Sequence, residues 1–105
     1  MLKVRLFTTP RLDLGDPRDK EFFEKNILAK GSEWADHYLT IDESKVDEDI
    51  IPVFLFKNIE FSDPPFEKSG TMIKEKYKII HKIKDEVSGE WMFYGYKISS
   101  DDISA

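Results

Sequence analysis

The pattern of apolar and polar residues alternates most regularly between residues 71 and 98. Lysine occupies nearly every second position over 74–84, and most of the positions between the lysines are apolar or aromatic. A turn-like polar segment follows at 85–90, and 91–98 is then rich in aromatic residues. Because successive side chains of a strand point to opposite faces, this pattern predicts a β-hairpin with one apolar face and one lysine face.

A single amphipathic helix over 71–87 is the alternative, because some of the apolar residues also have a helical spacing. Strands are favoured because the alternation is nearly strict and because aromatic residues prefer sheets. In the predicted pairing, one face of the hairpin carries apolar residues and one histidine, and we expect this face to belong to the core. Its members are Ile79, His81, Ile83, Met92, Tyr94, Tyr96 and Ile98.

Two further segments, 2–8 and 33–41, have the composition of strands. The acidic segment 42–49 lacks an apolar pattern and is expected to be a loop or one short helical turn. The proline-containing segment 62–70 predicts an extended loop. The polar tail 99–105 is expected to be frayed.

The segment 50–57 is apolar at both odd and even positions. This pattern predicts a strand that is covered on both faces. We therefore expect Phe54 and Phe56 to be buried on one side of the strand, and Val53 and Leu55 on the other. Truncation of a buried phenylalanine would then cost about 3–5 kcal/mol.

The clearest local signal is the start of a helix. Asp16 can cap the first turn with its carboxylate, Pro17 suits the first helical position, and Asp19 places negative charge near the positive end of the helix dipole. Gly31 is suited to the left-handed conformation that ends many helices. The sequence therefore predicts a helix over 17–30.

These elements predict an α+β fold: one N-terminal helix over about 17–30, packed on an antiparallel sheet of four or five strands. The sheet ends in the C-terminal hairpin at about 71–98. With 105 residues, 40% of them hydrophobic, the chain is expected to form a single domain over 1–105 with a core that needs neither metal nor disulfide.

The composition excludes several classes of function. The absence of cysteine rules out disulfides, thiolate metal sites and a cysteine nucleophile, and it fits a reducing cytosol. Neither a secretory signal nor an apolar run of about 20 residues is present, so a cytoplasmic location and no membrane partner are expected. The net charge of −5 argues against indiscriminate binding to nucleic acid or anionic membrane.

The charge is unevenly distributed. Residues 71–84 carry five lysines against one glutamate, a local net charge of +4. In the predicted hairpin the lysines share a face with aromatic residues, and this set is the first candidate binding surface, called here the predicted lysine face. It consists of Lys74, Lys76, Lys78, Lys82, Lys84, Trp91, Phe93 and Lys97.

Lysines interleaved with aromatic rings suit a single-stranded nucleic acid, because lysine binds phosphate and the rings stack on bases. They also suit an acidic protein partner, with the rings as apolar anchors. The solvated outer face of a sheet explains the same pattern without any partner. An alternative acidic surface could mimic nucleic acid or contact a basic groove, although a solvated connection also explains it. This acidic surface consists of Asp42, Glu43, Asp47, Glu48 and Asp49.

No arrangement in the sequence indicates catalysis. His37 and His81 are the only histidines, and no phosphate-binding loop or nucleophile motif is present. The carboxylates at the start of the helix are explained by capping and by a solvated helix face. We therefore expect no catalytic residue, no metal and no cofactor.

The leading hypothesis is a small acidic, non-catalytic binding protein of the cytosol, an inhibitor, adaptor or regulator whose macromolecular partner is a protein. Such a profile is typical of bacterial or phage accessory proteins. The first alternative is a single-stranded DNA or RNA binder that uses the predicted lysine face. The second is a small metal-independent enzyme or ligand-binding domain with a pocket near His81, Tyr94 and Tyr96.

Overall fold

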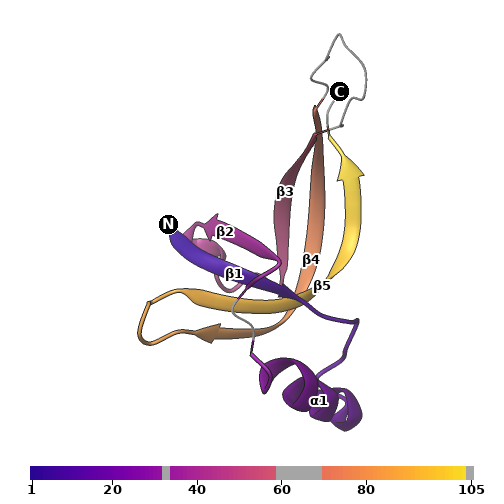
Figure 1. Cartoon of the computed structure of the whole chain (residues 1–105), viewed down its shortest axis with the longest axis vertical. Coiled ribbons are helices and arrows are strands. Elements are labelled where there is room, and N and C mark those ends of the chain that lie inside the picture. The colour runs from indigo at the N-terminus through magenta and orange to yellow at the C-terminus, as the bar shows by residue number, and fades with distance from the viewer. Residues whose placement is uncertain (32–33, 59–69, 104–105) are drawn as a thin grey trace.

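The computed structural model describes residues 1–31, 34–58 and 70–103. Five strands form one sheet, and a helical segment packs against one end of it (Figure 1). In chain order the elements are β1 (Leu2–Thr8), α1 (Pro17–Phe23), the π-helical turn η1 (Glu24–Leu28), β2 (His37–Ile41), the 3-10 turn η2 (Glu43–Lys45), β3 (Ile50–Asn58), β4 (Gly70–Lys84) and β5 (Trp91–Asp102). The predicted α+β fold is confirmed.

The strand order in the sheet is β2-β1-β5-β4-β3. Strand β1 is antiparallel to β2 but parallel to β5, whereas β4 is antiparallel to both β5 and β3. The sheet is therefore mixed, and the prediction of a purely antiparallel sheet is wrong at the pairing of β1 with β5. These two strands lie far apart in the sequence, so no short turn fixes the direction of their pairing.

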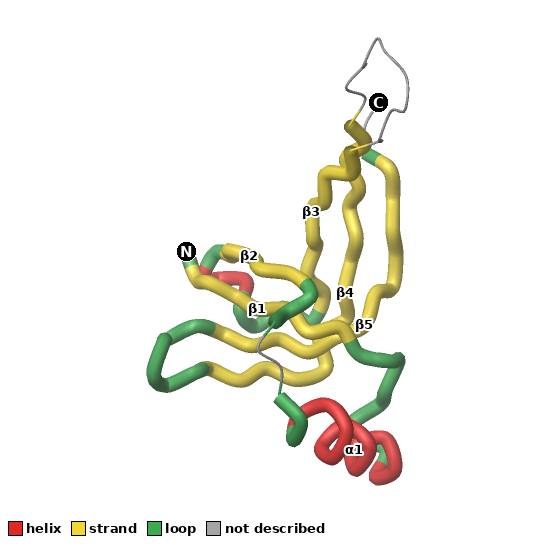
Figure 2. Tube along the Cα trace, in the orientation of Figure 1, coloured by secondary structure: helices red, strands yellow, loops and turns green. Residues whose placement is uncertain are grey.

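The hairpin of β4 and β5 is long and changes direction near its middle (Figure 2). Its register shifts between Lys76 and Tyr77, and again between Ile79 and His81. At the second shift, a Cβ atom on Gly95 would lie 2.4 Å from the carbonyl oxygen of Lys78. The close approach of the two backbones at this bend therefore requires glycine.

The apolar side chains form two clusters on opposite faces of the sheet. The inner cluster lies on the face around which the sheet folds, and the partly buried side chains of β2 and of Val46 pack against it. Its buried members are Val4, Leu6, Ile51, Val53, Tyr77, Ile79 and Phe93. The helix-side cluster lies between the sheet and α1, and its buried members are Phe7, Phe23 and Tyr94.

The register shift at Ile79 and His81 corrects the predicted core face. Ile79 belongs to the inner cluster, whereas His81 is paired with Tyr94 and packs against Phe23 on the helix side. Ile83 and Met92 also pack on the helix side, but Ile98 is exposed. The seven residues expected on one face are therefore divided, because the extra residue in β4 reverses the alternation.

The helix begins at the predicted residue. The Asp16 carboxylate accepts a hydrogen bond of 2.9 Å from the backbone N–H of Arg18, and Pro17 occupies the first turn. Phe23 is 2% exposed and fixes the helix on the sheet. The last helical residue is Leu28, two residues before the predicted end, and Gly31 has the expected positive φ of 60°.

Asp16→Ala is expected to lower the free energy of unfolding by about 1 kcal/mol, because it leaves a first-turn amide without its acceptor. Equilibrium urea unfolding measures this change. Glu21→Ala on the same helix is the control, since it removes only the exposed ion pair with Lys25, which contributes about 0.5 kcal/mol or less. Equal midpoints for the Asp16 variant and the parent would show that the cap does not stabilise the helix.

Strand β3 is at an edge of the sheet and is covered on one face only. Ile51 and Val53 are buried in the inner cluster. Phe54 and Phe56, in contrast, are 56% and 60% exposed. The prediction that both faces are covered is wrong, because α1 packs against the opposite end of the sheet (Figure 1).

The remaining predictions concern connections. The acidic segment contains the expected short helical turn, η2. The tail was expected to be frayed, but residues 99–102 continue β5 and pair with β4. The predicted proline-containing loop lies outside the described residues, except for Gly70, which begins β4. In the part of the chain that the structure describes, no helix is long and apolar enough to cross a membrane.

Candidate functional site

The predicted lysine face is divided between the two faces of the sheet. Opposed residues of paired strands lie on the same face. Lys82 is opposite Phe93, and Lys84 is opposite Trp91, both toward the inner cluster. Lys74, Lys76 and Lys78 lie on the other face, because the register shift comes between them and Lys82. The prediction from alternation put all these lysines on one face, whereas the register shift at the bend puts them on two.

Lys82 holds the acidic segment against the sheet. Its Nζ atom donates hydrogen bonds to the backbone carbonyls of Val46 (2.6 Å) and Glu48 (2.8 Å). The same atom lies 5.3 Å from the ring centroid of Phe93. These contacts give Lys82 a structural role, and Phe93, at 0% exposed, is unavailable to a partner.

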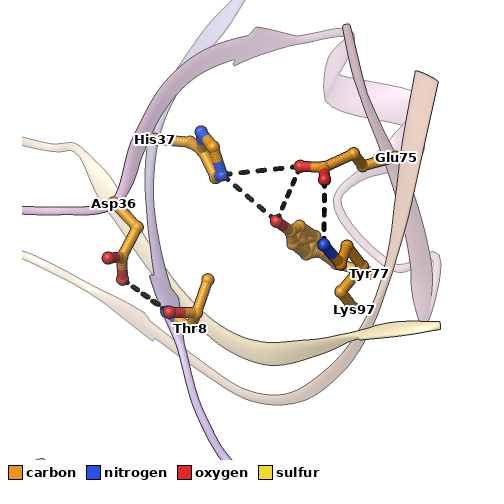
Figure 3. A network of polar contacts seen from close by, with 6 residues as sticks. All are labelled: Thr8, Asp36, His37, Glu75, Tyr77 and Lys97. Carbon is orange, nitrogen blue, oxygen red and sulfur yellow. Dashed lines mark hydrogen bonds and ion pairs between the residues drawn. The ribbon is translucent and has the colours of Figure 1, made fainter. Parts of the chain in front are cut away.

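Lys97 is also directed to the inner side, where it reaches a polar network (Figure 3). Its Nζ atom lies 3.2 Å from Oε2 of Glu75, a residue that is 8% exposed. Oε1 of Glu75 accepts a hydrogen bond of 2.9 Å from the Tyr77 hydroxyl, which lies 3.2 Å from Nε2 of His37. Burial, and then the adjacent Glu75, raise the pKa of Tyr77 well above its ordinary value. Tyr77 therefore stays neutral and donates to the carboxylate.

This network links β2 to β4 and β5 across the inner face. His37 comes from β2, and the edge of β2 is further fixed by Asp36, whose Oδ2 accepts hydrogen bonds from the backbone N–H and the hydroxyl of Thr8 (Figure 3). A buried carboxylate is tolerated when its oxygens are hydrogen-bonded and its charge is balanced. Both oxygens of Glu75 have such partners, so the network is well suited to a structural role.

The aromatic partners of the remaining lysines are on β3, where the sequence predicted buried residues. Phe54 is opposite Lys74, whose Nζ atom lies 5.8 Å from the ring centroid, and Phe56 is opposite Met72. We call this surface the outer β3–β4 face. It consists of Ile50, Pro52, Phe54, Phe56, Lys74, Lys76 and Lys78.

The outer β3–β4 face is mainly apolar, and carboxylates near it balance part of the positive charge of its lysines. Three large apolar side chains are exposed on β3, and Ile50, at 45%, is the least exposed of them. Lys78 lies 3.7 Å from the carboxylate of Asp49, and Lys74 is opposite Asp101 on β5. Two of the three lysines thus have a carboxylate nearby.

The acidic surface predicted over 42–49 is exposed, but several of its groups have local structural roles. Asp42 accepts hydrogen bonds of 2.9 Å from the backbone N–H and the hydroxyl of Ser44, and these bonds lower its pKa. Asp49 lies beside Lys78. Glu43 is in the turn η2 itself, whereas Asp47 and Glu48 extend from the following exposed segment. The capping and pairing fit a solvated connection.

Two residues of the catalytic alternative, His81 and Tyr94, have ring centroids 5.9 Å apart but line different clefts of the described structure. The His81 ring packs at 5.3 Å from Phe23, and burial lowers its pKa. Tyr94 lines a cleft of about 280 Å³ together with residues of η1 and β1, and the guanidinium of Arg11 lies 5.2 Å from the ring of Tyr96. The described residues contain no cluster of three or more His, Asp or Glu side chains that could hold a metal ion.

Aromatic exposure on β3 was detectable only in part from the sequence. The even positions of β3 carry Ile50, Phe54 and Phe56, but the odd positions are apolar too, so the sequence predicted that the whole strand is buried.

The chain was also compared with known protein families, with curated proteins and with solved structures, and none of these comparisons gave a significant match.

Proposed function

We propose that this chain is a non-catalytic binding protein that contacts a protein partner through the outer β3–β4 face and so acts as an inhibitor, adaptor or regulator. The observation that carries the proposal is the exposure of Phe54 and Phe56 on an edge strand, in register with a row of lysines. A cluster of exposed large apolar side chains bordered by charge is typical of protein interaction sites. The absence of cysteine favours a cytoplasmic setting.

A protein partner is favoured over nucleic acid by the charge of the face. A polyanion needs a continuous positive field, whereas Asp49 and Asp101 lie next to Lys78 and Lys74. A protein surface can instead cover the exposed rings and pair with individual charges at the rim. The apolar part of the surface then supplies most of the affinity, and the lysines contribute to orientation.

A single-stranded nucleic acid is the second candidate partner. The position of Lys74 beside the Phe54 ring favours it, because a base can stack on such a ring while the ammonium group binds phosphate. A fluorescent oligothymidine of about 16 nucleotides tests this possibility directly. If it binds tightly, with an affinity that falls steeply between about 50 and 200 mM salt, nucleic acid replaces protein as the partner.

The double variant Phe54→Ala/Phe56→Ala is expected to lose partner binding by at least about a hundredfold, since truncated interface anchors commonly cost about 2 kcal/mol or more each. The measurement is capture of partners from nuclease-treated native lysate, followed by titration of the captured partner. Phe22→Ala is the matched control, because Phe22 is an exposed phenylalanine on α1, away from the proposed surface. Equal binding by the double variant, the control and the parent would refute the proposal.

A further inference from the structure

Every second residue of β3 directs its backbone N–H and C=O groups away from β4. The register of the two strands shows which residues these are. The backbone N–H of Ile79 donates to the carbonyl of Asp49 at 2.7 Å, and the next pair along the ladder is Ile50 with Lys78. In an antiparallel pair, hydrogen-bonded and non-hydrogen-bonded positions alternate. The odd residues of β3 therefore bond to β4, and the even residues direct their N–H and C=O groups to the opposite edge.

Pro52 supports this assignment. It is the third residue of β3, an even residue opposite Lys76. Proline has no N–H, so within a sheet it is tolerated where that group would point away from the neighbouring strand. Phe54 and Phe56 are the next even residues, and both retain an N–H group.

The edge formed by Phe54 and Phe56 is open in the described structure. Strand β3 is the last strand of the sheet, and among the described residues it pairs with β4 alone. These two residues therefore present main-chain donors and acceptors at an edge where their own side chains are also exposed. An added strand would find both kinds of contact there.

A cleft of about 400 Å³ lies beside this edge, between β2 and β3. Of its apolar lining residues, Leu39, Ile41 and Ile51 belong to or pack against the inner cluster, whereas Tyr38 and Phe54 are exposed. The residues that line it are Met1, Tyr38, Leu39, Thr40, Ile41, Asp42, Lys45, Ile51, Pro52 and Phe54. Ile51 and Phe54 point to opposite faces of β3, yet both line this cleft, so the cleft reaches the edge of the strand. Side chains of a strand placed along this edge could therefore enter it.

We propose that an extended segment of the protein partner adds to the free edge of β3, and this inference rests on the proposed function. Main-chain hydrogen bonds form at Phe54 and Phe56. Alternate side chains of the segment enter the β2–β3 cleft and are apolar, because Leu39, Ile41 and Ile51 are among the residues that line it. The intervening side chains lie over the outer β3–β4 face and include acidic residues that complement its lysines.

A different chain fits this edge better than a second copy of the same protein. If β3 paired with β3 of a second copy, the short ladder would contain two Pro52 residues, each without an N–H donor. A strand from a different protein would pair with only one such residue. Two copies would also bring together molecules that each carry a net charge of −5.

The probe is a phage-displayed library of random linear peptides of about 12 residues, long enough to exceed a typical strand of about 6. It is selected on the intact protein, and the enriched peptide is then synthesised. We expect apolar residues at every second position, with acidic residues between them, and micromolar affinity. N-methylation of alternate peptide amides should weaken binding about tenfold for each pairing bond lost, while methylation of the intervening amides has little effect.

Proline substitution separates backbone from side-chain contributions on the protein. Phe56→Ala removes the ring alone, whereas Phe56→Pro also removes the outward N–H and leaves the ladder with β4 intact, as Pro52 already does. We expect the proline variant to bind the selected peptide about tenfold more weakly than the alanine variant. Far-UV circular dichroism confirms that both variants are folded, and the N-methylated peptides give the same information without altering the protein.

Several outcomes would overturn strand addition: no enriched peptide, a helical three-to-four-residue spacing, insensitivity to N-methylation, or equal binding by the two Phe56 variants. A parent protein that is dimeric in light scattering, and monomeric after Phe56→Pro, would identify a second copy as the occupant. If partner capture is lost in the Phe54→Ala/Phe56→Ala variant but strand addition fails, the proposed function stands with another binding mode. If capture is unaffected, both proposals fall.

Discussion

Phe93→Ala is expected to lower the free energy of unfolding by about 3–5 kcal/mol, which is the usual cost of removing a fully buried aromatic ring. Phe93 is 0% exposed, lies on β5 between β1 and β4, is opposite Leu6, and belongs to the inner cluster. The cavity left by its ring would be surrounded by strands that hold one another in place, so little relaxation can fill it. A loss of this size is a large part of the total stability of a small domain, about 5–15 kcal/mol.

Phe54→Ala is the matched comparison, since it removes the same atoms from a ring that is more than half exposed. We expect it to change stability by no more than about 1 kcal/mol. Urea unfolding of both variants, followed by tryptophan fluorescence and by circular dichroism, gives the two free energies. Similar losses for Phe93→Ala and Phe54→Ala would contradict the assignment of inner and outer faces.

Gly95→Ala is expected to destabilise the protein by about 3 kcal/mol, the upper end of the usual range for overpacking. The added Cβ atom would lie 2.4 Å from the carbonyl oxygen of Lys78 and 3.0 Å from Cδ1 of Ile79. The first of these atoms belongs to the backbone, so the two strands must separate at the register shift. The bend of the hairpin, and with it the direction of β3, depends on this contact.

Gly15→Ala is the control, because the nearest atom to its new Cβ is Oδ1 of Asp13, at the end of an exposed side chain that can move. It should shift the unfolding midpoint only slightly. If Gly95→Ala unfolds at the same urea concentration as this control, the two backbones do not need to approach closely at the bend.

Local sequence signals were sufficient for most of the secondary structure. The start of α1 follows from Asp16 and Pro17, because a cap depends on groups within one turn of each other. Strand β1 and the hairpin were predicted from alternation, since the two faces of a strand meet different environments. The continuation of β5 through Ser99 and Ser100 was missed, because pairing with β4, not their own composition, keeps these polar residues in the sheet.

The candidate site was predicted less well, because its composition depends on register. The sequence grouped Lys82 with Lys78 on one face, whereas the structure directs Lys82 toward Phe93 and Lys78 toward the outer side. Alternation predicts faces only in an unbroken strand. One extra residue in β4, accommodated opposite Gly95, turns Lys82 toward Phe93 and leaves Lys78 on the outside.

By itself, the sequence determined the element types, the capped helix, the long hairpin and the amount of apolar surface that must be buried, because these depend on local propensity and composition. Tertiary structure alone decided the parallel pairing of β1 with β5, the bend at Gly95 and the exposure of Phe54 and Phe56. Strand direction and register are fixed by contacts between residues distant in the chain. The outer face of β3 is exposed because the only described α-helix covers the other end of the sheet. The position of that helix depends on tertiary packing, so no local sequence pattern predicts it.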